Sequence, residues 1–192
     1  MRPPGPTGES DTRHVVLVGL MGVGKTTVGR RLAKELQRPF ADADEQIELR
    51  AGRTIPVIFH DEGEEAFRRL ETEVVADLLA RHHPLVVAAG GGVVTRPENR
   101  ALLVRHAFVV WLRASADFLA RRSDPRHRPL LAGAGDTAAA LERLVAERSP
   151  LYQAAADAVV DVETFHSGDD KPKRALAHHI ADLVGAHAGA SG

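Results

Sequence analysis

The sequence contains no cysteine, which excludes structural disulfides and thiolate metal sites and is compatible with a reducing cytoplasm. No apolar run is long enough to cross a membrane, and the first residues carry no hydrophobic segment typical of a secretion signal. The net charge is only -1, which provides no global attraction to nucleic acid or to an anionic membrane. We therefore expect a cytoplasmic protein that binds neither nucleic acid nor a membrane.

The length and composition predict one domain. A chain of 192 residues that is 44% hydrophobic can bury a single core. We expect residues 14–187 to form this domain, and we expect the protein to be a monomer. Residues 1–13, rich in proline, glycine and polar residues, are expected to be a disordered leader, and residues 188–192 a frayed tail.

From His14 onward, short β-branched runs alternate with longer helical patterns, an alternation typical of a parallel sheet covered by helices. The sequence therefore predicts an α/β fold. Strands are expected at residues 14–20, 39–44, 85–90, 107–112 and 158–162. Helices are expected at about residues 25–37, 63–81, 97–105, 115–122, 137–149 and 172–187.

The stretch GLMGVGKT fits the phosphate-binding pattern G-x-x-x-x-G-K-[ST] at Gly19, Gly24, Lys25 and Thr26. It follows an expected strand and opens an expected helix, which argues against an accidental glycine-rich turn. In such a loop, backbone N–H groups and the helix N-terminus face the phosphates. Lys25 would neutralise the β- and γ-phosphates, and the Thr26 hydroxyl would hold magnesium. Nucleotide binding is the prediction, and the phosphate acceptor stays open at this point.

Two carboxylates, Asp42 and Asp44, stand at the end of the second expected strand. Residues two apart on a strand face the same way, so both would enter one cleft at the carboxyl end of the sheet. One can serve the metal, and the other can accept a proton from a substrate hydroxyl. The alternative is that one of them, Asp44 in particular, caps the next helix, EQIELRAG.

Arginines supply the candidate anion-binding groups. Arg68 and Arg69 lie on a helix, where solvent exposure is the default for either. Arg148 follows Leu141 and Leu144 on the apolar stripe of its helix, so it must be paired or aimed into a pocket. The alternative for Arg148 is a side chain that extends to the helix end, where a cation is favoured.

The segment RRSDPRHRPLLAGAGD has no apolar periodicity and is expected to be a mobile loop. Its Arg122, Arg126 and Arg128 would close over phosphates as a lid, although such a cluster also suits a solvated loop. A run of three glycines ends the third expected strand, where missing side chains allow a ligand to approach the backbone. A tight turn is the alternative for this run, which comprises Gly90, Gly91 and Gly92.

Together these pieces resemble the shikimate kinase family, over nearly the whole chain from His14 to Leu183. The matching stretches, in the family's order, are GLMGVGKTTVGRRLAKEL, DADEQIE, AGRTIPVIFHDEGEEAFRRLE, AAGGGVV, RPLLAG and ERSPLY. The resemblance implies the fold of P-loop nucleoside monophosphate kinases, a five-stranded parallel sheet with a substrate-binding region and a lid. It implies transfer of the γ-phosphate of ATP to the 3-hydroxyl of shikimate, with Mg²⁺, in the route to chorismate and the aromatic amino acids.

The resemblance also implies roles for individual residues. The catalytic residues would be Lys25, Asp44 and Arg128. Shikimate would be bound by Asp44, Arg68, Gly90, Gly91, Gly92, Arg148, Phe59 and Phe67, with the two arginines clamping its carboxylate. The nucleotide would be bound by Gly22, Val23, Gly24, Lys25, Thr26, Thr27, Arg122 and Arg128. The metal residues would be Thr26 and Asp42, the latter through water.

The nearest alternative is another small-metabolite kinase of the same fold, such as a gluconate kinase. The paired Asp42 and Asp44 together with the FRR and GGG stretches argue against it. A nucleoside monophosphate kinase would need a pocket that reads a base rather than a carboxylate clamp. A regulatory GTP-binding module would need an Asn-Lys-x-Asp motif, which the sequence lacks.

Overall fold

The structure is a computed structural model that describes residues 13–122, 137–165 and 171–190. The expected leader apart from Arg13, the end of the expected tail, and Arg126 and Arg128 of the expected lid lie outside these residues. A sheet of five parallel strands has the order β2-β3-β1-β4-β5, which confirms the predicted sheet. The strands are β1 (His14–Val18), β2 (Phe40–Asp42), β3 (Val86–Ala88), β4 (Ala107–Arg113) and β5 (Ala158–Asp161).

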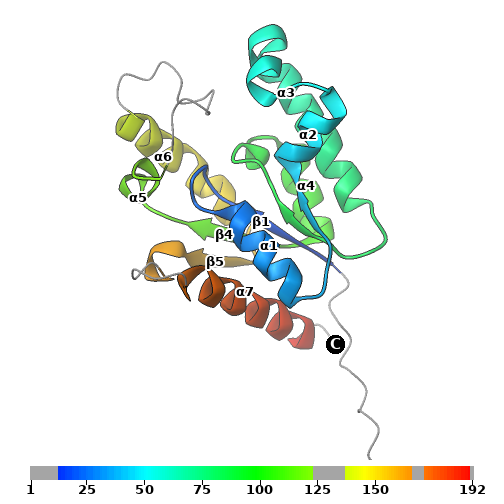
Figure 1. Cartoon of the computed structure of the whole chain (residues 1–192), viewed down its shortest axis with the longest axis vertical. Helices are drawn as coiled ribbons and strands as arrows, with labels where there is room; N and C mark the ends of the chain where they lie inside the picture. The colour runs from blue at the N-terminus through cyan, green and yellow to red at the C-terminus, as the bar shows by residue number, and fades with distance from the viewer. Residues whose placement is uncertain (1–12, 123–136, 166–170, 191–192) are drawn as a thin grey trace, which may run out of the picture.

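Helices cover the sheet, as Figure 1 shows. They are α1 (Lys25–Glu35), α2 (Ala43–Ala51), α3 (Ile55–Leu79), α4 (Pro97–His106), α5 (Ala116–Ala120), α6 (Thr137–Ala155) and α7 (Lys171–Ala190), with 3-10 turns η1 (Val93–Thr95) and η3 (Val162–Phe165). Helices α1 and α7 pack side by side, and α2 packs against α3 at the top right of the view. No helix within the described ranges is long and apolar enough to cross a membrane.

The core lies where the helices pack on the sheet. All five residues of β1 are buried, and so are the first six of β4. Strands buried on both faces need apolar residues at every position rather than at alternate ones, which explains the runs HVVLV and AFVVWL. The loops that follow the central strands therefore begin at the edge of a packed core.

Two helices differ from the lengths that the sequence pattern predicts. The pattern predicts only the part of α3 after Gly63, where the backbone has φ 80° and the helix kinks. Helix α6 continues past Pro150 to Ala155, beyond the expected end at residue 149. Arg148 therefore lies inside α6 rather than at its end, and the interpretation of its side chain as a charge extending to the helix terminus is wrong.

Strand register brings three functional segments to one edge of the sheet. Leu17 of β1 and Asp42 of β2 both lie level with Ala88 of β3, the strand between them. Because the strands are parallel, the chain leaves all three in the same direction. The phosphate loop after β1, the aspartates at the end of β2 and the glycines after β3 are consequently neighbours.

Candidate active site

The phosphate loop connects β1 to α1 and depends on glycine for its shape. Gly22 and Gly24 have φ angles of 81° and 100°, in the left-handed region that side chains disfavour. Gly24 is also the N-cap of α1, so the first backbone N–H groups of that helix are directed into the loop. Lys25 closes the loop by donating to the carbonyl oxygens of Gly19 at 2.7 Å and Leu20 at 3.1 Å.

A cavity of about 310 Å³ lies over this loop. Its lining residues are Met21, Gly22, Gly24, Lys25, Thr26, Thr27, Asp42, Asp44, Ala88, Ala89, Arg122 and Lys173. Of the described residues expected to bind the nucleotide, Val23 does not line this cavity, and its side chain is buried in the core. Lys173, in the first turns of α7, belongs to the cavity although no pattern in the sequence marks it.

Arg122 reaches the phosphate cavity from the end of α5. It is exposed, and its guanidinium carbon lies 5.0 Å from the centre of the Phe118 ring. With Lys25 and Lys173 it gives the cavity three cationic side chains from three parts of the chain. Arg128, the other expected lid cation, falls outside the described residues.

Asp42 links the strand, the next helix and the phosphate loop. Its Oδ2 accepts a hydrogen bond of 2.7 Å from the Thr26 hydroxyl, and its Oδ1 accepts one of 3.1 Å from the backbone N–H of Asp44. Asp42 is therefore the residue that caps α2, and the suggestion that Asp44 caps it is wrong. Because the cap ends β2 at Asp42, Asp44 lies in the first turn of α2 rather than on the strand. Both carboxylates nevertheless line one cavity.

A second cavity, of about 330 Å³, adjoins the first. It is lined by Met21, Thr26, Asp42, Asp44, Glu45, Glu48, Ile55, Pro56, Phe59, Phe67, Arg68, Glu71, Gly90, Gly91, Gly92 and Arg148. Every residue that the resemblance assigns to shikimate is in this set. Four residues line both cavities, namely Met21, Thr26, Asp42 and Asp44, so the two cavities meet at the aspartates and the magnesium candidate.

Arg68 is buried on α3, contrary to the default expectation of an exposed arginine. Its side chain is 7% exposed and donates to Glu71 at 2.8 Å and to Glu64 at 2.9 Å. Burial by itself lowers the pKa of this guanidinium, but the two carboxylates outweigh burial and raise it. Arg69, the next residue, points to solvent beside Glu65 as expected. Arg68 is thus a fixed cation in the wall of the second cavity.

Glu71 is a site residue that the sequence pattern did not identify. Its side chain is 1% exposed, and its Oε1 has no hydrogen-bond partner within the described part of the chain. Burial raises the pKa of this carboxyl, the Arg68 guanidinium opposes the rise, and the nearby Asp44 adds to it. In the sequence, its position three residues after Arg68, about one helical turn, indicates that the two side chains can pair.

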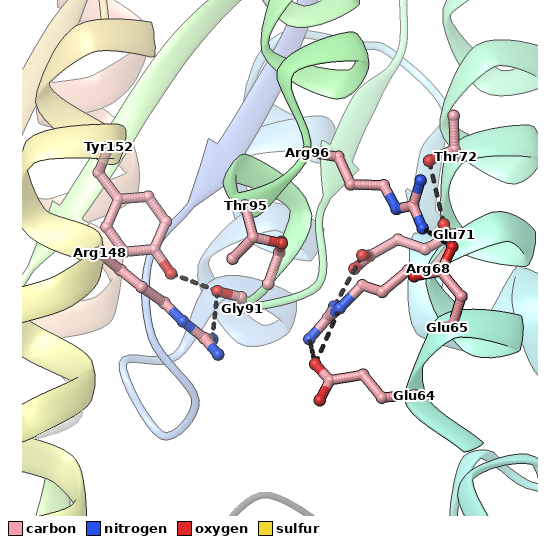
Figure 2. Close-up of polar contacts among 11 residues, drawn as sticks. Glu64, Glu65, Arg68, Glu71, Thr72, Gly91, Thr95, Arg96, Arg148 and Tyr152 are labelled. Atoms are coloured by element: carbon pink, nitrogen blue, oxygen red, sulfur yellow. Dashed lines mark hydrogen bonds and ion pairs between the residues drawn. The ribbon is translucent and has the colours of Figure 1, made fainter.

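Arg148 reaches the same cavity from α6, on the opposite side, as Figure 2 shows. It is 6% exposed, which confirms that a charge on the apolar stripe is aimed into a pocket. Its Nη1 donates to the carbonyl oxygen of Gly91 at 2.9 Å. Unlike Arg68, it forms no ion pair with any carboxylate among residues 13–122, 137–165 and 171–190. Its charge is therefore available to an anion in the cavity.

The glycine run after β3 is required by what surrounds it. A Cβ atom on Gly90 would lie 2.5 Å from Oε1 of Glu71 and 3.0 Å from Oδ1 of Asp44. A Cβ atom on Gly92 would overlap the guanidinium of Arg68. The run is a tight turn, and it is also the surface against which charged side chains of the cavity pack.

Two phenylalanines form the apolar part of the second cavity. The rings of Phe59 and Phe67 are tilted against each other with centres 4.7 Å apart. The guanidinium carbon of Arg68 lies 5.0 Å from the centre of the Phe67 ring. The cavity therefore offers an apolar wall, cations on two sides and carboxylates where it meets the phosphate loop, which suits a small anionic molecule that carries hydroxyl groups.

Comparisons with known proteins agree with this geometry. The family model for shikimate kinase matches residues 21–183. Shikimate kinase of Burkholderia thailandensis is 48% identical over 149 residues, which cover 77% of this chain and 80% of that protein. Shikimate kinase of Dechloromonas aromatica is 51% identical over 150 residues, 78% of this chain and 81% of that protein.

Solved structures give the same result for the fold. Shikimate kinase from Acinetobacter baumannii in complex with shikimate superposes with a TM-score of 0.83 at 37% identity, covering 93% of this chain and 96% of that chain. Shikimate kinase from Aquifex aeolicus superposes with a TM-score of 0.74 at 31% identity, covering 92% and 98%. The fold is that of the P-loop nucleoside monophosphate kinases, as predicted, and the chain belongs to the shikimate kinase family.

Proposed function

We propose that the two cavities hold ATP and shikimate, and that the protein transfers the γ-phosphate of ATP to the 3-hydroxyl of shikimate. The observation that carries this proposal is that the cavity over the phosphate loop and the cavity lined by Arg148 meet at Asp42 and Asp44. A phosphate held in the first cavity is thereby adjacent to a hydroxyl held in the second. Membership of the shikimate kinase family favours shikimate over gluconate as the acceptor.

The nucleotide would be held mainly by charge. Backbone N–H groups of Gly22, Gly24 and the start of α1 would surround the phosphates, and the helix N-terminus adds partial positive charge. Lys25 would leave the carbonyls of its own loop to contact the β- and γ-phosphates. Arg122 and Lys173 would add two further cations, from the end of α5 and the start of α7.

Thr26 and Asp42 fit a magnesium ion. Their oxygens lie 2.7 Å apart in the phosphate cavity, and hydroxyl and carboxylate oxygens are ligands that Mg²⁺ prefers. We infer that these two residues would hold the ion next to the phosphates. When bound, the ion would neutralise phosphate charge and orient the γ-phosphoryl group.

The acceptor would be oriented by its carboxylate. Two arginines line the cavity, but Arg68 is already paired with Glu64 and Glu71, whereas Arg148 donates to a backbone carbonyl and forms no ion pair with a carboxylate among the described residues. A carboxylate entering the cavity would gain most from the guanidinium that is not yet neutralised. We therefore assign the larger share of carboxylate binding to Arg148, with Arg68 as the second arm of the clamp.

Asp44 would act on the acceptor hydroxyl. It lies where the cavities meet, and its Oδ1 and the Oε1 of Glu71 both lie close to Gly90. In the transfer, the acceptor oxygen bonds to the γ-phosphorus, the bond from that phosphorus to ADP breaks, and the hydroxyl proton passes to the Asp44 carboxylate. Phe59 and Phe67 would exclude water from this region.

The experiment that tests this function measures ADP release from MgATP by the purified protein. Shikimate, gluconate and a nucleoside monophosphate are supplied as separate acceptors. We expect release that depends on shikimate. Release that depends on another acceptor, or on none, would refute the assignment while leaving the phosphate loop as a nucleotide site.

A further inference from the structure

Tyr152 lies one helical turn after Arg148 on α6 and is almost completely enclosed. It is 1% exposed, and its ring stacks on Trp111 with centres 5.5 Å apart. Its hydroxyl donates to the carbonyl oxygen of Gly91 at 2.5 Å. Burial raises the pKa of this phenol, so the hydroxyl stays protonated and remains a donor at neutral pH.

The Gly91 carbonyl accepts two hydrogen bonds from the same helix, as Figure 2 shows. A carbonyl oxygen has two lone pairs, and here Arg148 and Tyr152 take one each. The two donors have different prospects when substrate arrives. Arg148 would turn toward the acceptor carboxylate, whereas the buried ring of Tyr152, packed on Trp111, would keep its position.

The backbone that Tyr152 holds lies at the junction of the two cavities. The Cα of Gly91 packs against the phosphate loop, where an added Cβ would lie 3.5 Å from the backbone nitrogen of Met21 and 3.6 Å from the carbonyl oxygen of Gly19. Its neighbours Gly90 and Gly92 contact the carboxylates and the guanidinium of the acceptor cavity. A shift of this turn would therefore alter the positions of the carboxylates and of the guanidinium in the acceptor cavity at once.

We propose that Tyr152 is a positioning residue for the acceptor, whose hydroxyl fixes the Gly91 carbonyl and so holds the glycine turn in place while Arg148 engages the substrate carboxylate. The proposal rests on the function proposed above and extends it to a residue that touches neither substrate. It explains why a hydroxyl is buried at this position of α6. A phenylalanine there would fill the same space and make the same ring contact with Trp111.

The substitution Tyr152→Phe tests the proposal because it removes one oxygen and leaves the ring. Losing a single hydrogen bond to the turn is expected to raise the KM and Kd for shikimate about three- to tenfold. The Kd for ATP should change by less than about twofold, because the phosphate loop, although it touches Gly91, is fixed at both ends by β1 and α1. The measurements are steady-state kinetics with each substrate varied, and calorimetric titration of each ligand.

Ser149→Ala is the matched control. It also removes a hydroxyl from α6, but that hydroxyl donates at 2.6 Å to the carbonyl of Val145 within the helix and not to the turn. Its constants for both substrates should stay at the wild-type values. The thermal midpoint of each variant shows whether the fold itself has been weakened.

Two outcomes would overturn the positioning role. In one, Tyr152→Phe binds shikimate as well as the wild type and the Ser149→Ala control do. In the other, shikimate and ATP affinities fall equally together with the thermal midpoint, which would give Tyr152 a purely structural role. Failure of the proposed function looks different, because the wild type itself would then show no shikimate-dependent ADP release, and both proposals would be refuted.

Discussion

Replacing Arg148 by alanine removes the cation that faces the acceptor cavity without a carboxylate partner among the described residues. A hydrogen-bonded charge pair in a largely buried site contributes about 2 to 4 kcal/mol to binding when one partner is truncated. Shikimate affinity should therefore fall roughly 30- to 700-fold. ATP affinity should change little, because Arg148 does not line the phosphate cavity.

The fold should survive this substitution. Arg148→Ala removes one hydrogen bond to the Gly91 carbonyl, but Tyr152 still donates to the same oxygen. A loss of about 1 kcal/mol in a domain of this size lowers the thermal midpoint by roughly 2 to 4 °C. Arg143→Ala is the matched control, since Arg143 is exposed on the same helix. Its ligand affinities should equal those of the wild type.

Calorimetric titration of each variant with shikimate and with ATP, together with thermal unfolding, distinguishes the outcomes. Equal losses of affinity for the two ligands would show that Arg148 supports the fold rather than the acceptor. An Arg148→Ala variant that binds shikimate as the wild type does would refute the reasoning that Arg148, which has no carboxylate partner in the described part of the chain, provides most of the carboxylate binding.

Three further predictions concern the proton acceptor, the metal and the pH dependence of stability. Asp44→Asn should lower kcat about 100-fold or more with little change in ATP affinity, and unchanged turnover would exclude Asp44 as the base. Thr26→Ala should raise the Mg²⁺ concentration needed for half-maximal activity about tenfold, whereas Thr26→Ser should stay near wild type. A magnesium requirement that is the same in all three proteins would argue against Thr26 as a ligand. Burial lowers the pKa of His14, so the unfolded chain takes up a proton on this residue before the folded one does. The contribution of neutral His14 to the free energy of unfolding is present above pH 6.5 and is lost as the pH falls through the folded pKa. The free energy of unfolding should therefore decrease less steeply between pH 7 and 5 in His14→Asn than in the wild type. The measurement is the free energy of unfolding from urea titrations at each pH, and an equal pH dependence in the two proteins would contradict this.

Features that depend on local sequence could be predicted. The phosphate loop is a continuous motif whose glycines, lysine and threonine act at fixed spacing, so its position and its place between strand and helix follow directly. The parallel sheet follows from alternating apolar runs. The burial of Arg148 followed from its place on an apolar stripe, because burying a charge at random is too costly.

Features that depend on contacts between distant segments could not be predicted. The strand containing Asp42 ends early because its side chain caps α2 and accepts a hydrogen bond from Thr26, a residue in the first turn of α1. Arg68 is buried because α3 packs over the glycine turn, which its own helix does not reveal. Lys173 joins the site through the packing of α7 and stands in no pattern that marks function. Tyr152 belongs to the stretch ERSPLY, but its hydrogen bond to the Gly91 carbonyl depends on the packing of α6.

The central claim is that the acceptor is recognised by its carboxylate, in the cavity that meets the phosphate loop. The most direct test compares the kcat/KM of the wild-type protein for shikimate and for shikimate methyl ester, which keeps the ring and hydroxyls but lacks the negative charge. We predict a preference for shikimate of about 30-fold or more, arising mainly in KM. Equal kcat/KM for the acid and the ester would contradict the claim.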